Sequence, residues 1–232
     1  MKGKTIIQIL LAIVIVVLAW LLYSSIMKPV RFDSEFNTRR DACAVKLKTI
    51  RTLEESYKLT YSRYTGDFDT LVNRLLNEDS LLVSQKHYNY DKIPADVDYT
   101  EMPEAELIKK GYLEIRREYV NPIAQLREQG KLKYTDKDGG VHEFTDNDLK
   151  NLRYLPYPEG TKEEFQLAAS QIDKGGFMMP VFECKVDLPT LMSDCDEQLV
   201  KNRVAEIEAV SGKYAGWKVG SLTETIVEGN FE

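Results

Sequence analysis

The hydrophobic pattern of the chain begins with an unbroken apolar run close to its N-terminal end. Residues 6–27 read IIQILLAIVIVVLAWLLYSSIM, in which only Tyr23 carries an ionisable side chain. At about 1.5 Å rise per residue, a helix over this range is about 33 Å long and can cross a hydrocarbon core of roughly 30 Å. The run is longer than the apolar region of a cleaved signal peptide, which spans about 7–15 residues. We therefore predict a transmembrane anchor at residues 1–28, with the lipid bilayer as its partner through residues 6–27.

A proline separates this anchor from a second, amphipathic pattern. Pro29 lacks a backbone N–H and restricts the residue before it, so we expect the anchor helix to end or kink there. Asp33 or Ser34 can then cap a stem helix within residues 29–66. Apolar side chains recur in the stem at Phe36, Cys43, Leu47, Ile50, Leu53, Tyr57, Tyr61 and Tyr64. Steps of three, four and seven residues place them on one face of the helix.

The opposite face of the stem is charged. It holds Arg39, Lys46, Lys48, Arg51, Glu55 and Lys58. One apolar and one charged face favour a stem that packs against its own domain, whereas a self-associating coiled coil needs a steadier heptad. Glu54 and Glu55 point about 100° apart on a helix and cannot share a substrate, so we expect both to lie on a solvated face.

Residues 67–232 alternate short apolar runs with turn residues, a pattern typical of an α+β domain. Helices are expected where a capping residue precedes an apolar stripe: from Asp67, with Phe68 buried, from Thr100 to Lys110, and from Ser193 or Asp194 to about Tyr214. Strands are expected at 112–120, 152–157, 164–172, 177–186 and 217–222, with a hairpin at 131–144. Residues 84–98 are polar and tyrosine-rich, which predicts a loop.

The turns between the last strands are short, and short links join antiparallel strands. The C-terminal helix is expected to pack through Leu199, Val200, Val204, Ile207, Val210 and Tyr214. The predicted class is therefore α+β: an N-terminal transmembrane helix and an amphipathic stem helix packed on a small antiparallel sheet, with one further C-terminal helix. Residues 67–232 form the extracytoplasmic domain in this prediction.

Charge and cysteine content narrow the function classes. The chain has 31 basic and 37 acidic residues and a net charge of −6, which argues against nucleic-acid binding because that function needs a clustered basic surface. Cys184 and Cys195 enclose a short segment and form either a disulfide or two free buried thiols. Cys43 lies on the apolar stripe, where a small buried residue is favoured over an intermolecular bridge.

The motifs that mark common catalytic and cofactor sites are missing from the sequence. His87 and His142 are far apart, and neither has the ligand spacing of a metal site. The acidic cluster near Cys195 consists of Asp187, Asp194, Asp196 and Glu197. Negative charge on the first turn of a helix explains this cluster better than a calcium loop, which needs six or more oxygen ligands. We expect no catalytic, cofactor-binding or metal-binding residue, and no cofactor.

Two resemblances add to this interpretation. The start Gly3-Lys4-Thr5-Ile6-Ile7-Gln8-Ile9-Leu10 and the stem residues Ala44, Leu47, Ile50, Tyr57, Tyr61, Tyr64 and Gly66 resemble type IV pilins and type II secretion pseudopilins. Lys4 and Gln8 stand where those families have an apolar residue and a glutamate. The resemblance implies a long helix packed on a C-terminal antiparallel sheet.

The chain also resembles an uncharacterised family of single-anchor bacterial envelope proteins. The pieces that carry this likeness are Ile50-Arg51, Tyr57-Lys58, residues 64–71 (YTGDFDTL), residues 180–183 (PVFE) and residues 229–232 (GNFE). Basic residues flank both ends of the anchor, so the positive-inside rule does not decide its orientation. The resemblance and the cysteine pattern instead favour a cytoplasmic N-terminus, which places the domain in the periplasm.

These features predict a non-enzymatic, single-pass protein of the inner membrane. It would act as a scaffold or assembly component through contacts with other envelope proteins or with itself. Two alternatives remain: a membrane-tethered enzyme or ligand-binding domain whose site one sequence does not reveal, and a divergent pseudopilin subunit.

Overall fold

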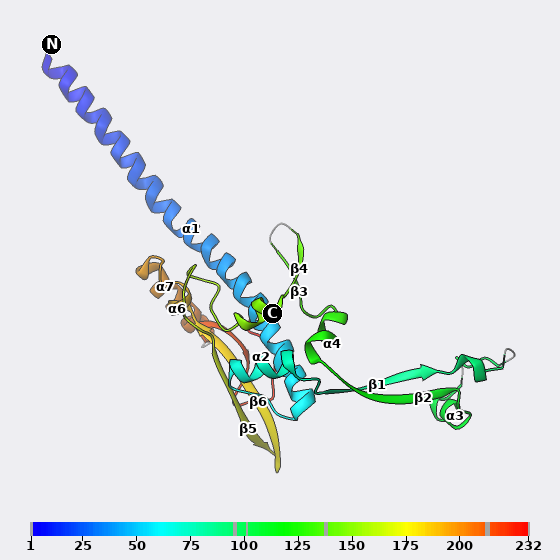
Figure 1. Ribbon diagram of the computed structural model, residues 1–232. Coiled ribbons are helices and arrows are strands. Elements are labelled where there is room, and N and C mark those ends of the chain that lie inside the picture. The colour runs from blue at the N-terminus through cyan, green and yellow to red at the C-terminus, as the bar shows by residue number, and fades with distance from the viewer. Residues whose placement is uncertain (1, 95–96, 101, 137–138, 212–213, 232) are drawn as a thin grey trace.

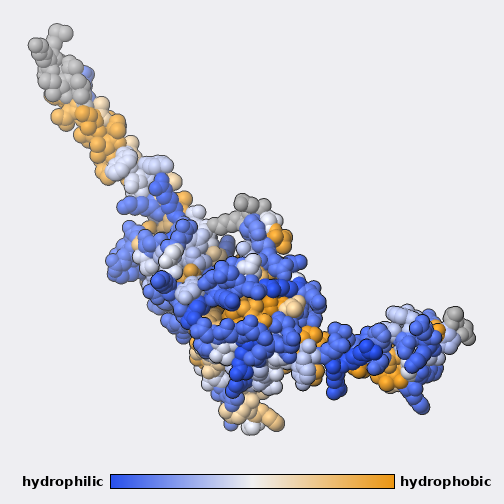
Figure 2. All heavy atoms as spheres, viewed as in Figure 1, coloured by the Kyte–Doolittle hydropathy of each residue, from blue (hydrophilic) through white to orange (hydrophobic). Residues whose placement is uncertain are grey.

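The longest element of the fold is the N-terminal helix. In the computed structural model, α1 (Lys2–Tyr61) is continuous, and its N-terminal part stands clear of a body formed by later elements (Figure 1). The structure describes residues 2–94, 97–100, 102–136, 139–211 and 214–231. Among these, α1 is the one helix long and apolar enough to cross a membrane, and its free part is visibly apolar (Figure 2). By length and composition it is compatible with a single transmembrane anchor.

The anchor helix does not end at Pro29 as one form of the prediction had it, because the proline lies inside α1. A proline within a helix costs about 3 kcal/mol or more, but helices that span membranes accommodate such prolines. Contacts just beyond the proline attach the helix to the body. Phe32 is buried, and Asp33, which was expected to cap a new helix, instead forms an ion pair with Arg203 of α7 (Glu197–Ser211).

The core lies between the C-terminal half of α1 and a three-stranded antiparallel sheet. The strand order is β5 (Gln166–Lys174), β6 (Phe177–Asp187) and β7 (Gly216–Gly220). The apolar stripe predicted for the stem is confirmed in its central part, where the buried members are Cys43, Leu47, Ile50, Leu53 and Tyr57. Phe182, Cys184 and Val186 of β6 are buried in the same core, two residues apart as the pleat of a strand requires.

The turn that follows α1 lies directly on this sheet. A Cβ atom at Gly66 would lie 3.1 Å from the backbone nitrogen of Ala169 in β5, so a side chain there would displace the strand. Beside it, Tyr64 is buried against Phe182, with 4.7 Å between the ring centroids. These contacts attach the end of α1 to the sheet.

Short elements complete the body. They are α2 (Phe68–Asn77), α4 (Pro122–Glu128), β3 (Lys133–Thr135), β4 (Val141–Glu143), α5 (Asp146–Lys150) and α6 (Leu188–Leu191). The predicted start of α2 is confirmed, since Asp67 caps it by accepting a hydrogen bond from the Thr70 N–H at 2.8 Å and Phe68 is buried. The predicted hairpin at 131–144 is confirmed as β3 paired with β4.

A separate hairpin projects from the body. It consists of β1 (Leu81–Tyr88) and β2 (Leu113–Val120), paired antiparallel over their full length. Between them lie the 3₁₀ helix η1 (Tyr90–Lys92) and the helix α3 (Glu104–Lys109). Figure 1 shows β1 and β2 extending away from the other elements, with α3 at the far end. We name residues 81–120 the arm.

Some predicted elements differ from the structure. Residues 84–88 are the outer half of β1 and not a loop, because pairing with β2 satisfies their backbone groups whatever their side chains. Residues 152–157 were predicted as a strand but form only a single β-bridge, between Tyr154 and Glu164. The third strand of the sheet is β7. Pro156 and Pro158 lack the N–H donors that a longer strand pairing needs.

Two predicted helices start later than expected. Pro103, and not Thr100, occupies the N-cap position of α3. In α7 the cap is Asp196, whose Oδ1 accepts hydrogen bonds from the N–H groups of Gln198 and Leu199. Val210, expected on the apolar stripe of α7, is 83 % exposed.

Candidate functional site

Most described residues of the arm are exposed to solvent; only Leu107 and Leu113 among them are buried. Its sheet has two strands in the described part of the chain, so the outer edge of each strand carries unpaired backbone groups. At its base, the Asn121 side chain donates a hydrogen bond to the carbonyl of Leu76 at 2.9 Å and ties the arm to α2. The arm is thus fixed at one end and open along its length.

One face of the arm carries an apolar row, formed by Leu82, Ile115 and Tyr119. Their exposed fractions are 49, 43 and 67 %. Leu82 is the register partner of Tyr119, and Ile115 is the partner of Lys86. Antiparallel partners share a face, and side chains two or four residues apart in a strand do too, so the three residues follow one side of the ribbon.

The reverse face is polar in its outer part. It carries Gln85, His87, Glu114, Arg116 and Glu118. All five side chains are exposed. Ser84, Lys86 and Arg117 share the face of the apolar row and are exposed, so this face is mixed, with apolar side chains suited to a contact and two cations beside them. The outer part of the reverse face is polar throughout.

The tip of the arm is held by aromatic and ionic contacts. The rings of Tyr88, Tyr90 and Tyr99 contact one another, with centroid separations between 5.7 and 6.1 Å. Lys86 of β1 forms an ion pair with Glu104 of α3. These contacts order the tip in advance, and a preorganised surface loses less conformational entropy when it binds.

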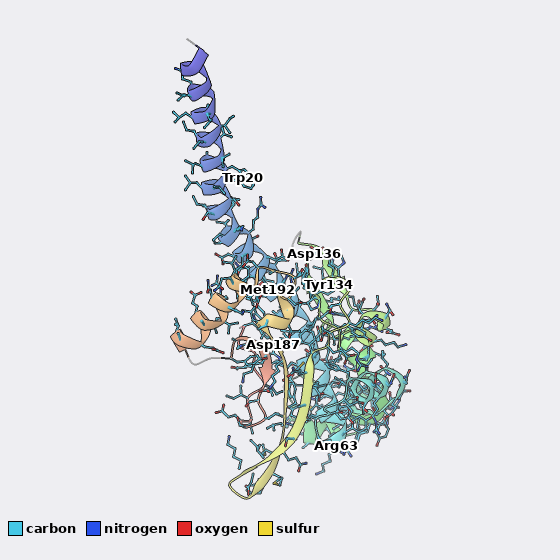
Figure 3. All side chains as sticks on the ribbon, turned by 90° about the vertical axis from the view of Figure 1, so that its left-hand side faces the viewer. Trp20, Arg63, Tyr134, Asp136, Asp187 and Met192 are labelled. Carbon is cyan, nitrogen blue, oxygen red and sulfur yellow. The ribbon has the colours of Figure 1, made fainter. Side chains whose placement is uncertain are left out.

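A second candidate lies in a cavity of about 370 Å³ between α1 and the β3–β4 hairpin. Ala42, Val45, Tyr134, Phe144 and Pro156 form its apolar walls. Its charged lining consists of Lys46 and the carboxylates Asp41, Asp136 and Asp148. Figure 3 shows Tyr134 and Asp136 at the end of the body nearest the free part of α1, which carries Trp20.

Lys46, predicted on the charged face opposite the apolar stripe, contacts the body. Its side chain is half-buried, and its Nζ donates to the carbonyl of Tyr154 at 2.7 Å. Burial lowers the pKa of the Lys46 amine, because desolvation disfavours the charged form. The Asp148 carboxylate has a lowered pKa, since it accepts hydrogen bonds from the hydroxyl and the N–H of Thr145.

Glu54 was expected on a solvated face, and this prediction is wrong, because the residue is fully buried. Its Oε2 accepts a hydrogen bond from the Thr65 N–H at 3.0 Å, and its Oε1 has no partner among the described residues. Burial raises the pKa of this carboxyl to about 8. The sequence could have predicted this burial from the spacing of Ile50, Glu54 and Tyr57. Glu54 lies four positions after one core residue and three before the next, which places it on the same face of the helix.

Arg39, predicted on the charged face of the stem, is buried in the structure. The residue is only 4 % exposed. Its guanidinium donates to both carboxylate oxygens of Asp194, to Oε1 of Glu35 at 2.8 Å and to the carbonyl of Leu191 at 2.7 Å. The guanidinium also lies 5.1 Å from the centre of the Tyr157 ring. Arg39 therefore joins α1 to the segment before α7.

The acidic residues near Cys195 cap helices or form an ion pair. Asp187 caps α6 through the Thr190 N–H, Asp194 binds Arg39, and Asp196 caps α7. Within the described ranges, no group of three or more His, Cys, Asp or Glu side chains is placed to hold a metal ion. His87 lies on the arm and His142 on β4, where it contacts Asp136 at 2.7 Å.

All three cysteines are free, so the disulfide alternative for Cys184 and Cys195 is wrong. Cys184 is buried in the core, whereas Cys195 is half-buried near the surface. Cys43 is buried as predicted, and burial raises the pKa of its thiol to about 12.

The fold is a mixed one of helices and small antiparallel sheets behind a long apolar N-terminal helix. Comparison with known proteins gives no matching family model, no matching curated protein and no matching solved structure.

Proposed function

We propose that this chain is a non-enzymatic, membrane-anchored scaffold of the bacterial cell envelope that binds a partner protein through the arm. The observation that carries the proposal is the apolar row, held outside the body on a preordered ribbon. Exposed apolar side chains with a polar rim are characteristic of protein contact sites. All three side chains of the row are exposed, so they contribute little to the stability of the fold.

Site-specific photo-cross-linking in intact cells tests this function. A benzophenone side chain at Tyr119 is expected to give a cross-linked product of one discrete mass. The matched control places the same side chain at Glu118, the neighbouring residue on the reverse face. Equal products from both positions, or none from position 119, would contradict recognition by the apolar row.

The proposed location is the inner membrane, with residues 67–232 in the periplasm. An impermeant maleimide tests it on a variant with Gln85→Cys, an exposed position on the reverse face of the arm, in a background with Cys195→Ser. Cys43 and Cys184 are buried and stay unreactive until the protein unfolds. Labelling in intact spheroplasts supports the periplasmic location, and labelling that begins only when the membrane is broken would reverse the orientation.

The cavity beside Lys46 favours a second candidate function, a membrane-tethered ligand-binding domain. Three carboxylates, one amine and two aromatic rings line it, which suits an apolar ligand with a positive charge. Tryptamine and indole-3-acetate have the same ring and opposite charges. Tryptamine is expected to raise the melting temperature and indole-3-acetate is not, with the effect of tryptamine reduced in an Asp41→Asn variant; equal shifts would exclude this ligand class.

A divergent pseudopilin is a third candidate, supported by the continuity of α1 from its apolar part to its packed part. The mass of the N-terminal peptide tests it. A chain that starts at Lys4 with a methylated amine would support processing, whereas an intact Met1 would exclude it.

A further inference from the structure

A third cavity lies where α1 reaches the body. Its volume is about 380 Å³, and it lies between one face of α1 and the start of α7. α1 contributes Lys28, Arg31, Phe32 and Glu35 at steps of three, one and three residues, which keeps them on one face. α7 and its cap contribute Asp196 and Leu199.

The two cations of this cavity have no ion-pair partner among the described residues. Nearby basic side chains are neutralised: Arg39 binds Glu35 and Asp194, and Arg203 binds Asp33. Lys28 and Arg31 lie one turn apart on the same face, where like charges repel. An anion placed between them relieves this repulsion.

The two carboxylates at the cavity each have one oxygen in use and one without a partner among the described residues. Glu35 presents Oε1 to Arg39, and Asp196 presents Oδ1 to the N–H groups at the start of α7. The remaining oxygens, Oε2 of Glu35 and Oδ2 of Asp196, can accept hydrogen bonds from a cationic donor. The cavity thus has separate places for an anion and for a cation.

The order of these charges along α1 matches a phospholipid headgroup. Tyr23 is placed near the membrane interface by the apolar run that ends at residue 27, and Lys28 lies about 7 Å farther along the helix. Glu35 lies about 10 Å beyond Lys28 in the same direction. Basic side chains at this depth meet lipid phosphates, and Glu35 lies on the outer side of Lys28 and Arg31.

We propose that this cavity binds an aminophospholipid of the phosphatidylethanolamine type. Its phosphate contacts Lys28 and Arg31, and its primary ammonium donates to Glu35 and Asp196. An anionic headgroup such as phosphatidylglycerol lacks the cation that the carboxylates require, and phosphatidylcholine lacks the N–H donors. The inference rests on the membrane anchor of the proposed function and adds a lipid preference to it.

Spin-labelled lipids measure this preference directly. The full chain is reconstituted in phosphatidylcholine vesicles that contain spin-labelled phosphatidylethanolamine, phosphatidylglycerol or phosphatidylcholine, and electron paramagnetic resonance gives the protein-associated fraction of each. Phosphatidylethanolamine is expected to associate about threefold more strongly than the other two, the size typical of exposed charge pairs.

Three variants locate the effect. Asp196→Asn keeps a residue that caps α7 well, and it is expected to abolish the preference for phosphatidylethanolamine over phosphatidylcholine. Arg31→Gln is expected to lower association of both phosphatidylethanolamine and phosphatidylglycerol. Lys48→Gln removes an exposed cation of α1 outside the cavity and is expected to change nothing.

The outcomes separate this inference from the anchor itself. A chain that floats with vesicles but associates equally with all three lipids, or best with phosphatidylglycerol, would overturn the headgroup site and leave the anchor intact. An unchanged preference in Asp196→Asn would also overturn it. A chain that does not float with vesicles would overturn both the anchor and the site.

Discussion

The molecule contains two long antiparallel hairpins with different surroundings. β5 and β6 lie against α1, and Phe182 and Cys184 of β6 are almost fully buried there. β1 and β2 pair just as completely, but of their side chains only Leu113 is buried. The same local structure therefore forms part of the core in one place and an open surface in the other. Stability should depend on the first hairpin and recognition on the second.

The largest expected effect is in the core. Leu53→Ala removes a fully buried side chain of α1, and we expect it to lower the free energy of unfolding by about 3–4 kcal/mol. Ile115→Ala on the arm should lower it by less than about 0.5 kcal/mol, since that residue is 43 % exposed. Urea denaturation of both variants measures the difference, and equal losses would remove the distinction between the core and the arm.

The next largest expected effect is the pH dependence of stability that Glu54 causes. Its pKa is about 8 in the folded chain and about 4.5 when unfolded, so the folded state holds a proton that the unfolded state releases. Stability is therefore full below pH 4.5 and is lost as pH rises to about 8. Glu54→Gln mimics the protonated form and should be about 2–4 kcal/mol more stable than the original chain at pH 9, with no difference at pH 4.

Denaturation curves at several pH values test this linkage. Glu55→Gln, next to it on an exposed face, is the matched control and should leave the pH profile unchanged. A profile of Glu54→Gln that parallels that of the original chain would show that the carboxyl titrates normally.

Arg39 is expected to have an intermediate effect. Arg39→Met breaks the contacts with Asp194, Glu35 and the Leu191 carbonyl, and we expect a loss of about 2 kcal/mol. The loss is limited because the side chains of Asp194 and Glu35 are 47 and 42 % exposed and water can solvate them. Thermal unfolding at low and high salt measures it, and Arg40→Met, an exposed neighbour, should have no effect.

The smallest effect on stability is expected on the apolar row. Tyr119→Ser should shift the unfolding midpoint by less than about 0.5 kcal/mol, because the side chain is 67 % exposed. The same variant should abolish cross-linking from a benzophenone at position 115. A clear loss of stability would show that the row packs on the body, and preserved cross-linking would show that the partner binds elsewhere.

Periodicity along the chain was sufficient for several parts of the fold. The apolar run at residues 6–27 predicted the helix that stands clear of the body, and steps of three and four predicted the buried positions from Cys43 to Tyr57. Alternation and turn residues predicted β5, β6 and the β3–β4 hairpin. These features depend on local geometry, because the side-chain period of a helix or strand is a property of its backbone.

The parts that failed depend on partners distant in the chain. Residues 84–88 are polar, yet they form a strand because β2 lies opposite. Arg39 is buried because Asp194 and Leu191, more than 150 positions later, satisfy its donors.

Tertiary structure also decided what the candidate sites are. Glu54 was read as a solvated residue from its charge, although its spacing placed it among core residues. On the arm, Lys86 and Arg117 share a face with the apolar row, and no pattern along the two strands shows whether another layer covers that face. A sequence determines which side chains share a face, whereas the packing of distant segments determines whether that face meets the core, another molecule or water.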